Sequence, residues 1–154
     1  MARFDRGPLQ GFVQTPEGLL DDALELLTRE GTLLKVPYAE TKAVCFIRDF
    51  DSGEVWKRDR AFLARPKSPG LWIRFVFRDG DTLEGLLPND LLTVEAAGFQ
   101  AIPPDANPQN QRVFVPKAAL TSVEVLGVVG SPLKSKSKAA KSARESDRQL
   151  SIFD

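Results

Sequence analysis

The sequence predicts an all-β protein built from two repeated small β-barrel units, followed by a disordered C-terminal tail. The stretches VPYAETKAV (36–44) and VPKAALTSV (115–123) share the pattern Val-Pro-x-Ala-x-x-x-x-Val, at an offset of 79 residues. A β pattern that recurs in this way indicates that one structural unit occurs twice. Residues 131–147 are mostly lysine, serine and alanine. Such a segment does not bury enough apolar surface to offset the entropy of ordering, so we expect it to be disordered.

The second half contains the clearest hairpin signal. Residues 71–77 (LWIRFVF) and 82–87 (TLEGLL) flank Asp79-Gly80, a dipeptide typical of a type I′ turn. We expect Gly85, inside the second of these strands, to mark a bulge or a bend. The elements expected to follow are a strand at 91–102 with a bulge or bend at Gly98, a loop at 103–111, a strand at 112–116, a short turn and a final strand.

Two interpretations compete for the first half. Residues 23–28 and 32–36 flank the turn-like triplet REG and are typical of a hairpin. The alternative is a helix over 15–27, which would start at a threonine cap followed by proline and carry leucines at helical spacing. The repeat favours the hairpin, because PLQGFV matches TLEGLL with Gly11 at the place of Gly85.

These patterns predict four segments along the chain. A first unit covers 1–55, a basic linker covers 56–70, a second unit covers 71–130, and the tail covers 131–154. Each Val-Pro pair places a residue without a backbone donor where a strand gives way to a turn. This is the expected behaviour of a barrel corner.

The composition excludes several kinds of active site. The 154 residues include no histidine and a single cysteine, Cys45, and the formal net charge is zero. The chain therefore lacks the residues required for catalysis by Ser-His-Asp or Cys-His groups and for most zinc sites. We expect a non-enzymatic protein without metal or cofactor, in which Cys45 is a small buried residue. The sequence shows no signal peptide and no apolar stretch of about 20 residues, so we expect a cytoplasmic protein that does not enter a membrane.

Two stretches of the second half resemble a known fold. FRDGDTLEGLL and RVFVPKAALTSVEVL are similar to the Sm-like small barrel, which has a charged turn with glycine, a glycine-bearing strand and a late Val-Pro corner. This resemblance implies a small β-barrel. The asparagine of Sm-like RNA pockets has a loose counterpart in Asn89. The whole chain also resembles an uncharacterised bacterial family with stretches similar to VPYAETKAVCFIRDF and NQRVFVPKAALTSVEVLG, and that resemblance implies no activity.

The segment between the halves is basic and aromatic. Tryptophan and phenylalanine alternate there with the cations Lys57, Arg58, Arg60, Arg65, Lys67 and Arg74. Cations that follow phosphates and rings that stack on bases suit RNA or single-stranded DNA. The alternative is a linker, with its aromatic rings packed into the barrels and its charges solvated or paired with Asp49, Asp51 and Glu54. Residues 1–133 carry a charge of −3, which favours the linker.

The chain ends in a short apolar peptide, Gln149-Leu150-Ser151-Ile152-Phe153. It resembles the bacterial sliding-clamp-binding motif Gln-Leu-Ser/Asp-Leu-Phe, with isoleucine in place of the second leucine. The resemblance implies an adaptor that docks on the clamp, the glutamine making hydrogen bonds and the apolar side chains filling pockets. The peptide has two alternative interpretations, as an edge strand on the protein's own barrel or as a tail without function. The second functional hypothesis is binding of RNA or single-stranded DNA, and the oligomeric state stays open.

Overall fold

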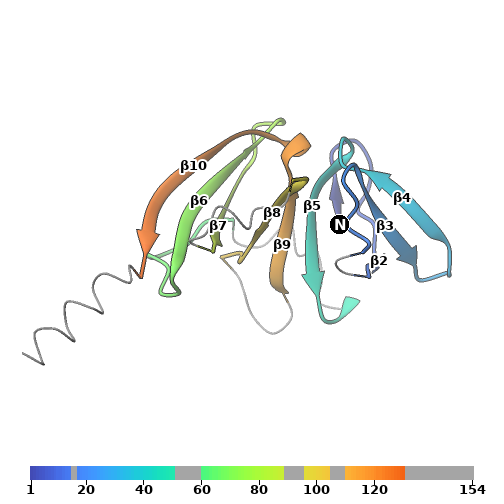
Figure 1. Cartoon of the computed structure of the whole chain (residues 1–154), viewed down its shortest axis with the longest axis horizontal. Coiled ribbons are helices and arrows are strands. Elements are labelled where there is room, and N and C mark those ends of the chain that lie inside the picture. Colours follow the sequence, from blue (N-terminus) through green and yellow to red (C-terminus); the bar gives the residue numbers. More distant parts are fainter. Residues whose placement is uncertain (15–16, 51–59, 89–95, 105–109, 131–154) are drawn as a thin grey trace, which may run out of the picture.

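The computed structural model describes residues 1–14, 17–50, 60–88, 96–104 and 110–130. Within these ranges the chain forms ten strands and the short 3-10 helix η4 (Lys117–Ala119), and every strand pair is antiparallel (Figure 1). The predicted all-β class is confirmed. In the part of the chain that the structure describes, no helix is long and apolar enough to span a membrane.

The strands form three sheets. The central sheet has the order β1-β5-β9-β8, from β1 (Ala2–Arg3), β5 (Thr41–Ile47), β9 (Asn110–Pro116) and β8 (Gly98–Ala101). The second has the order β10-β6-β7, from β10 (Leu120–Val129), β6 (Gly70–Phe77) and β7 (Thr82–Leu87). The third has the order β2-β3-β4, from β2 (Gly11–Phe12), β3 (Ala23–Thr28) and β4 (Leu33–Pro37).

The two halves of the chain have the same order of neighbouring strands. In the second half β10 pairs with β6, β6 with β7, and β8 with β9, while a bridge between Leu86 and Ile102 links β7 to β8. In the first half β5 pairs with β1, β2 with β3, and β3 with β4. Hydrogen bonds between Met1 and Leu9, which lie next to these strands, connect the segment of β1 to that of β2: the N–H of Leu9 donates to the carbonyl of Met1, and the N-terminal ammonium of Met1 donates to the carbonyl of Leu9. If the strands of each half are numbered along the chain, both halves have the same order of neighbours: the fifth strand lies beside the first, which is followed by the second, third and fourth.

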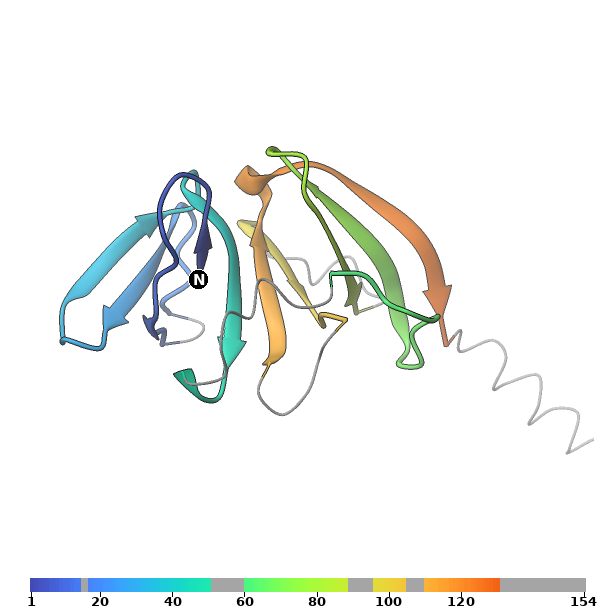
Figure 2. The same ribbon diagram turned by 180° about the vertical axis from the view of Figure 1, so that it is seen from behind.

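Strands β5 and β9 join the halves and separate two hydrophobic cores. They lie side by side in the middle of the molecule, with β3 and β4 at one end and β6 and β10 at the other (Figures 1 and 2). Successive side chains of a strand point to opposite faces. Val113 and Val115 therefore enter the core of the second half, while Phe114 enters that of the first. Ala43 and Val44 divide in the same way on β5.

The turn between β6 and β7 differs from the predicted type I′ turn. Such a turn needs a positive φ at both central residues, but in the described ranges only glycines have positive φ, so Asp79 does not, whereas Gly80 has φ +90°. The N–H of Gly80 bonds to the carbonyl of Phe77 at 3.0 Å, and the N–H of Phe77 to that of Asp81 at 2.8 Å. The connection is a three-residue loop ending in a left-handed glycine, and the type I′ prediction was wrong.

Of the bulge or bend predicted at Gly85 and at Gly98, the bulge is absent at both positions. Both glycines hold a regular register, Gly85 opposite Ile73 and Gly98 opposite Pro116. A Cβ atom on Gly98 would lie 2.4 Å from the carbonyl oxygen of Val115, so glycine is needed for close approach of the backbones. The register irregularities of the second half lie instead in β10, where it pairs with β6, and in β9, where it pairs with β5.

Two other strand predictions can be compared with the structure. Ala23–Thr28 forms β3, so the hairpin interpretation of the first half is confirmed and the helix over 15–27 was wrong. Of the strand predicted at 91–102, β8 covers 98–101, and residues 91–95 lie outside the described ranges. The predicted tail at 131–154 lies outside them as well.

Candidate functional site

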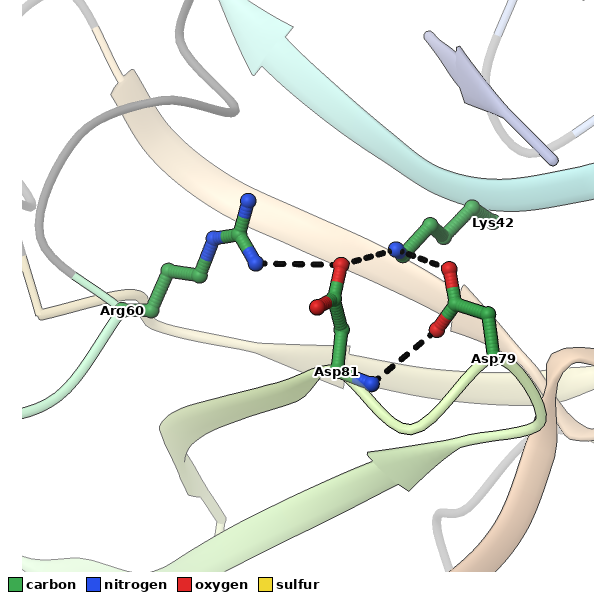
Figure 3. Close-up of polar contacts among 4 residues, drawn as sticks. All are labelled: Lys42, Arg60, Asp79 and Asp81. Carbon is green, nitrogen blue, oxygen red and sulfur yellow. Dashed lines mark hydrogen bonds and ion pairs between the residues drawn. The ribbon is translucent and has the colours of Figure 1, made fainter.

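A cluster of four charged side chains joins the two halves of the molecule (Figure 3). Lys42 stands on β5, Asp79 and Asp81 flank the loop glycine between β6 and β7, and Arg60 comes from the segment before β6. The Nζ atom of Lys42 donates to Oδ2 of Asp79 and to Oδ2 of Asp81, each at 2.5 Å. Arg60 contacts Oδ2 of Asp81 at 3.1 Å. The cluster therefore connects residues separated by 37 and 39 positions in the chain.

Lys42 is the buried member of this cluster. Its residue is 6% exposed, whereas the side chains of Asp79 and Asp81 are 39% and 42% exposed. The aromatic rings of Phe4 and Phe77 lie 5.7 and 5.3 Å from its ammonium group. A buried ammonium group needs opposite charge or hydrogen-bond acceptors, and the two carboxylates supply both.

The cluster also sets the ionisation of one carboxylate. A hydrogen bond from Lys42 is the largest effect on Asp81 and holds its pKa below the ordinary value. Burial, the next largest effect, opposes this hydrogen bond, while the charges of Lys42 and Arg60 act with it. Asp81 is thus kept as a carboxylate that faces two cations. Groups arranged in this way stabilise each other electrostatically, which suits a structural connection between the halves.

A second polar centre lies on β7. Glu84 is buried, and its Oε2 accepts hydrogen bonds from the backbone N–H of Phe62 at 3.0 Å and from Nε1 of Trp72 at 3.1 Å. Phe62 and Trp72 pack edge to face, with ring centroids 6.3 Å apart. The backbone N–H of Glu84 bonds to the carbonyl of Arg60 at 2.7 Å. These contacts attach the segment before β6 to the surface of the second half.

The cations predicted to bind nucleic acid are partly engaged within the chain. Arg60 pairs with Asp81, Arg65 donates to the carbonyl of Val128 at 2.7 Å, and Arg74 contacts Glu84 and Glu124 at 3.4 and 3.2 Å. Lys67 is exposed. Lys57 and Arg58 lie outside the described residues. Pairing of these cations within the chain is what the linker interpretation expects, but Arg60 and Arg74 contact Asp81, Glu84 and Glu124, which that interpretation did not name. Of the carboxylates that it named, Asp51 and Glu54 lie outside the described residues.

An apolar pocket opens on the first half. Its volume is about 280 Å³, and its lining includes Leu26, Val44 and the half-buried Cys45, with Arg48 and Asp49 as its charged residues. Small-molecule sites usually occupy about 300–1,000 Å³ and gather a few convergent polar groups. This pocket lies just below that range and indicates no particular ligand. Among the described residues, no group of three or more histidine, cysteine, aspartate or glutamate side chains could hold a metal ion.

The terminal peptide Gln149-Leu150-Ser151-Ile152-Phe153 lies outside the described residues, and so does Asn89. The charged cluster, by contrast, is well described but was not predicted. The one available signal was Lys42 itself, a lysine between Thr41 and Ala43 in an otherwise apolar strand. Lysine is rarely fully buried without a partner, so its position indicates a counter-charge. Nothing in the sequence pattern identified Asp79 and Asp81 as that partner.

Together, the paired halves and the charged cluster define an all-β protein whose polar contacts serve mainly to join its parts. The family model described as "Family of unknown function (DUF6982)" matches residues 1–127, and the chain belongs to this family. The match covers both halves of the fold and ends within β10. Comparison with curated proteins and with solved structures found no match.

Proposed function

We propose that the protein is a non-enzymatic adaptor that binds a partner protein through Gln149-Leu150-Ser151-Ile152-Phe153. The partner that we propose is the bacterial sliding clamp, which would place the protein in the cytoplasm. The observation that carries the proposal is the pentapeptide itself, which matches the clamp-binding pattern in four positions and has isoleucine for leucine in the fifth. It follows the polar segment 131–147, whose composition suits a tether.

The physical basis is that of a peptide anchor. Each large apolar side chain of the motif contributes about 1.5–3 kcal/mol when it is buried in a pocket, before the cost of ordering the peptide. A tether between anchor and folded body leaves the body available for a second partner at high effective concentration. Such an arrangement makes a clamp-bound adaptor useful without any chemistry of its own.

The fold supports an interaction module. Each half has five strands in the same order, and each carries a Val-Pro pair at the end of its fourth strand, Pro37 in β4 and Pro116 in β9. This order and this corner support the interpretation of the halves as two Sm-like small barrels. The engaged arginines of the segment before β6 give no specific support to nucleic-acid binding, which is therefore kept as an outcome of the test.

The test is binding of the full-length protein to purified sliding clamp, measured by calorimetry or by fluorescence anisotropy. We expect saturable binding that is lost in a Leu150→Ala/Phe153→Ala variant and changes little with salt concentration. The matched control is Leu133→Ala, which removes a leucine from the same tail outside the motif and should leave the affinity unchanged.

The opposite results are equally distinct. Absence of binding at high micromolar clamp, or equal binding by the double alanine variant, would remove the proposal. Affinity for single-stranded RNA or DNA that falls steeply with salt and survives deletion of the last six residues would assign the function to the basic segment instead.

A further inference from the structure

The first strand is much shorter in one half of the molecule than in the other. Strand β1 has two residues, whereas β6 has eight. Strand β6 pairs with β10 from Phe77 to Gly70, and with β7 from Val76 to Leu71. The pairing of β1 with β5, by contrast, is limited to the two residues of β1. A long first strand therefore completes the second half, and the first half has only its beginning.

The repeat shows which part of β6 has no equivalent in β1. The alignment of PLQGFV with TLEGLL puts Leu9 at the place of Leu83. The backbone partner of Leu9 is Met1, and that of Leu83 is Phe75. Met1 therefore takes the place of Phe75. Among the described residues, none of the first half takes the places of 70–74.

The apolar pocket of the first half lies at these places. In the second half, residues 70–74 run between 84–87 of β7 and 124–129 of β10. The repeat relates these two flanking stretches to 10–13 and 45–50. Every residue of 10–13 and 45–50 lines the pocket, whose volume is about 280 Å³. The pocket thus has the position of a strand between β2 and β5, and we call it the strand slot.

The core of the first half is incompletely covered at the strand slot. Val13 and Phe46 pack against that core but are only partly buried. Leu87, the counterpart of Val13, pairs with Leu71 of β6 and is 5% exposed. Leu71 and Ile73 belong to the core of the second half and are 8% and 1% exposed. Because alternate side chains of a strand face the same side, an added strand in the slot needs apolar side chains at these two places.

The terminal peptide has apolar side chains at the same two places. The stretch GLWIR forms residues 70–74, and the peptide QLSIF forms residues 149–153. Both have leucine at the second position and isoleucine at the fourth. The pattern Leu-x-Ile occurs nowhere else in the sequence. In the slot, Leu150 and Ile152 would face the core as their counterparts do in the second half.

The last position of the peptide also fits the strand slot. In the second half, Arg74 contacts one glutamate of β7 and one of β10. The counterparts of these glutamates at the slot are Gln10 and Cys45, neither of which is a carboxylate. The peptide has Phe153 at the place of Arg74. An uncharged side chain thus replaces the arginine where its two acidic partners are replaced as well.

The segment before the peptide is long enough for docking within one chain. Residues 130–148 separate β10 from the peptide. An extended chain spans about 3.3 Å per residue, so this tether reaches about 60 Å. A compact body of roughly 130 residues has a radius of gyration of about 14 Å. The peptide can therefore reach the strand slot of its own chain.

We propose that residues 149–153 dock in the strand slot of their own chain as an added strand between β2 and β5. The peptide runs antiparallel to both neighbours, with Leu150 and Ile152 directed into the core of the first half. This docking does not require the sliding clamp. The slot and the clamp compete for the same five residues, so that a docked peptide is withheld from the clamp, and this consequence rests on the proposed function.

The test uses Cys45, the single cysteine of the chain, as a probe inside the slot. The proposed register places Phe153 opposite Cys45, as Arg74 lies opposite Glu124. The Cα atoms of opposite residues in an antiparallel pair lie about 4.5–5.5 Å apart, which is within the range of a disulfide. We expect the full-length variant Phe153→Cys to form a disulfide within one chain at equilibrium with reduced and oxidised glutathione, measured by mass spectrometry.

The matched control is Ser151→Cys, which has nearly the same tether. In the proposed register its Cα lies about 7–8 Å or more from that of Cys45, too far for an unstrained disulfide. We expect the equilibrium constant for closure to be about tenfold larger for Phe153→Cys, because docking raises the effective concentration of the aligned pair. Adding Leu150→Asp and Ile152→Asp to each cysteine variant should abolish this difference.

The opposite outcomes are defined by the same measurement. Equal equilibrium constants for the two cysteine variants would overturn the docking, because an undocked tail brings either position to Cys45 equally often. A disulfide that joins two chains would assign the slot to the peptide of a second copy and overturn docking within the chain. Since no clamp is present, the result decides the docking separately from the proposed function, which is decided by the binding experiment with purified clamp.

Discussion

Two hairpin loops in this molecule have the same backbone and different surroundings. The loop between β3 and β4 and the loop between β6 and β7 each span three residues and end in a glycine, Gly31 with φ +89° and Gly80 with φ +90°. In each, the glycine N–H bonds to the carbonyl three residues earlier, at 3.0 Å. The residue before the glycine is acidic in both, Glu30 in one and Asp79 in the other. Local sequence thus determines the same turn twice.

The difference lies in what each loop contacts. Glu30 is exposed, whereas Asp79 and Asp81 hold the buried ammonium of Lys42 across the boundary between the halves. One acidic loop residue is therefore part of a solvated turn, and its counterpart is part of the connection that positions two cores. The comparison shows that the residues of the turn determine its backbone conformation. Whether an acidic side chain of that turn contributes to stability depends on contact with a residue of a distant strand.

The largest expected effect comes from removing both carboxylates. The variant Asp79→Asn/Asp81→Asn should lose about 3 kcal/mol of unfolding free energy, because the buried ammonium of Lys42 loses the charge of the two carboxylates that contact it, while the amides still accept hydrogen bonds. Urea unfolding measures this loss. The matched change Glu30→Gln in the other loop should stay within about 0.5 kcal/mol. Equal effects in the two loops would contradict the role assigned to the cluster.

A smaller loss is expected from removing the cation. Lys42→Met should cost about 2 kcal/mol, since the two carboxylates left behind are partly exposed to water and Asp81 keeps Arg60. Comparing this variant with the double asparagine variant in the same urea experiment tests which partner is buried. If Lys42→Met lowered the unfolding free energy more than the double asparagine variant, the burial of the ammonium group would not explain the cost of breaking the cluster.

A still smaller and equal effect is expected at the two glycines. Nothing lies within 4 Å of a Cβ atom built on either Gly31 or Gly80, so backbone conformation alone decides the cost of a side chain. Gly31→Ala and Gly80→Ala should each lose about 1 kcal/mol, as expected for alanine in a left-handed conformation. A clearly larger loss for Gly80→Ala would mean that the charged cluster depends on the exact path of its loop.

Features of the fold that depend on residues close together in the chain were predicted correctly from the sequence. Strand positions such as 23–28 and 112–116 follow from side-chain pattern and turn residues, and the fold class follows from them. The turn type at Asp79-Gly80 and the close approach at Gly98 were missed. Loop length depends on the register of the flanking strands, and the need for a glycine in a regular strand depends on a neighbouring backbone that the local pattern does not reveal.

The candidate site was less predictable than the fold. Arg60 was selected as a contact for nucleic acid, yet its structural partner is Asp81, 21 positions later in the chain. Charge alone does not distinguish a cation that faces solvent from one that faces a distant carboxylate. The alternation of β5 and β9 side chains between two cores was equally hidden, because both faces of these strands are buried and the sequence shows no alternation of apolar and polar residues.

The smallest expected effect is a change in acid sensitivity. Since the hydrogen bond from Lys42 lowers the pKa of Asp81 in the folded protein, the unfolded chain takes up a proton at this carboxyl first as pH falls below about 4. The stabilising contribution is therefore present above that pH and is lost as pH falls through the lower pKa of the folded state. Asp81→Asn should flatten the decline of unfolding free energy in acid, because it removes the carboxyl whose pKa is lowered in the folded protein. Parallel declines in Asp81→Asn and the unchanged protein would mean that other carboxyl groups control acid unfolding, and that the two loops differ in geometry more than in charge.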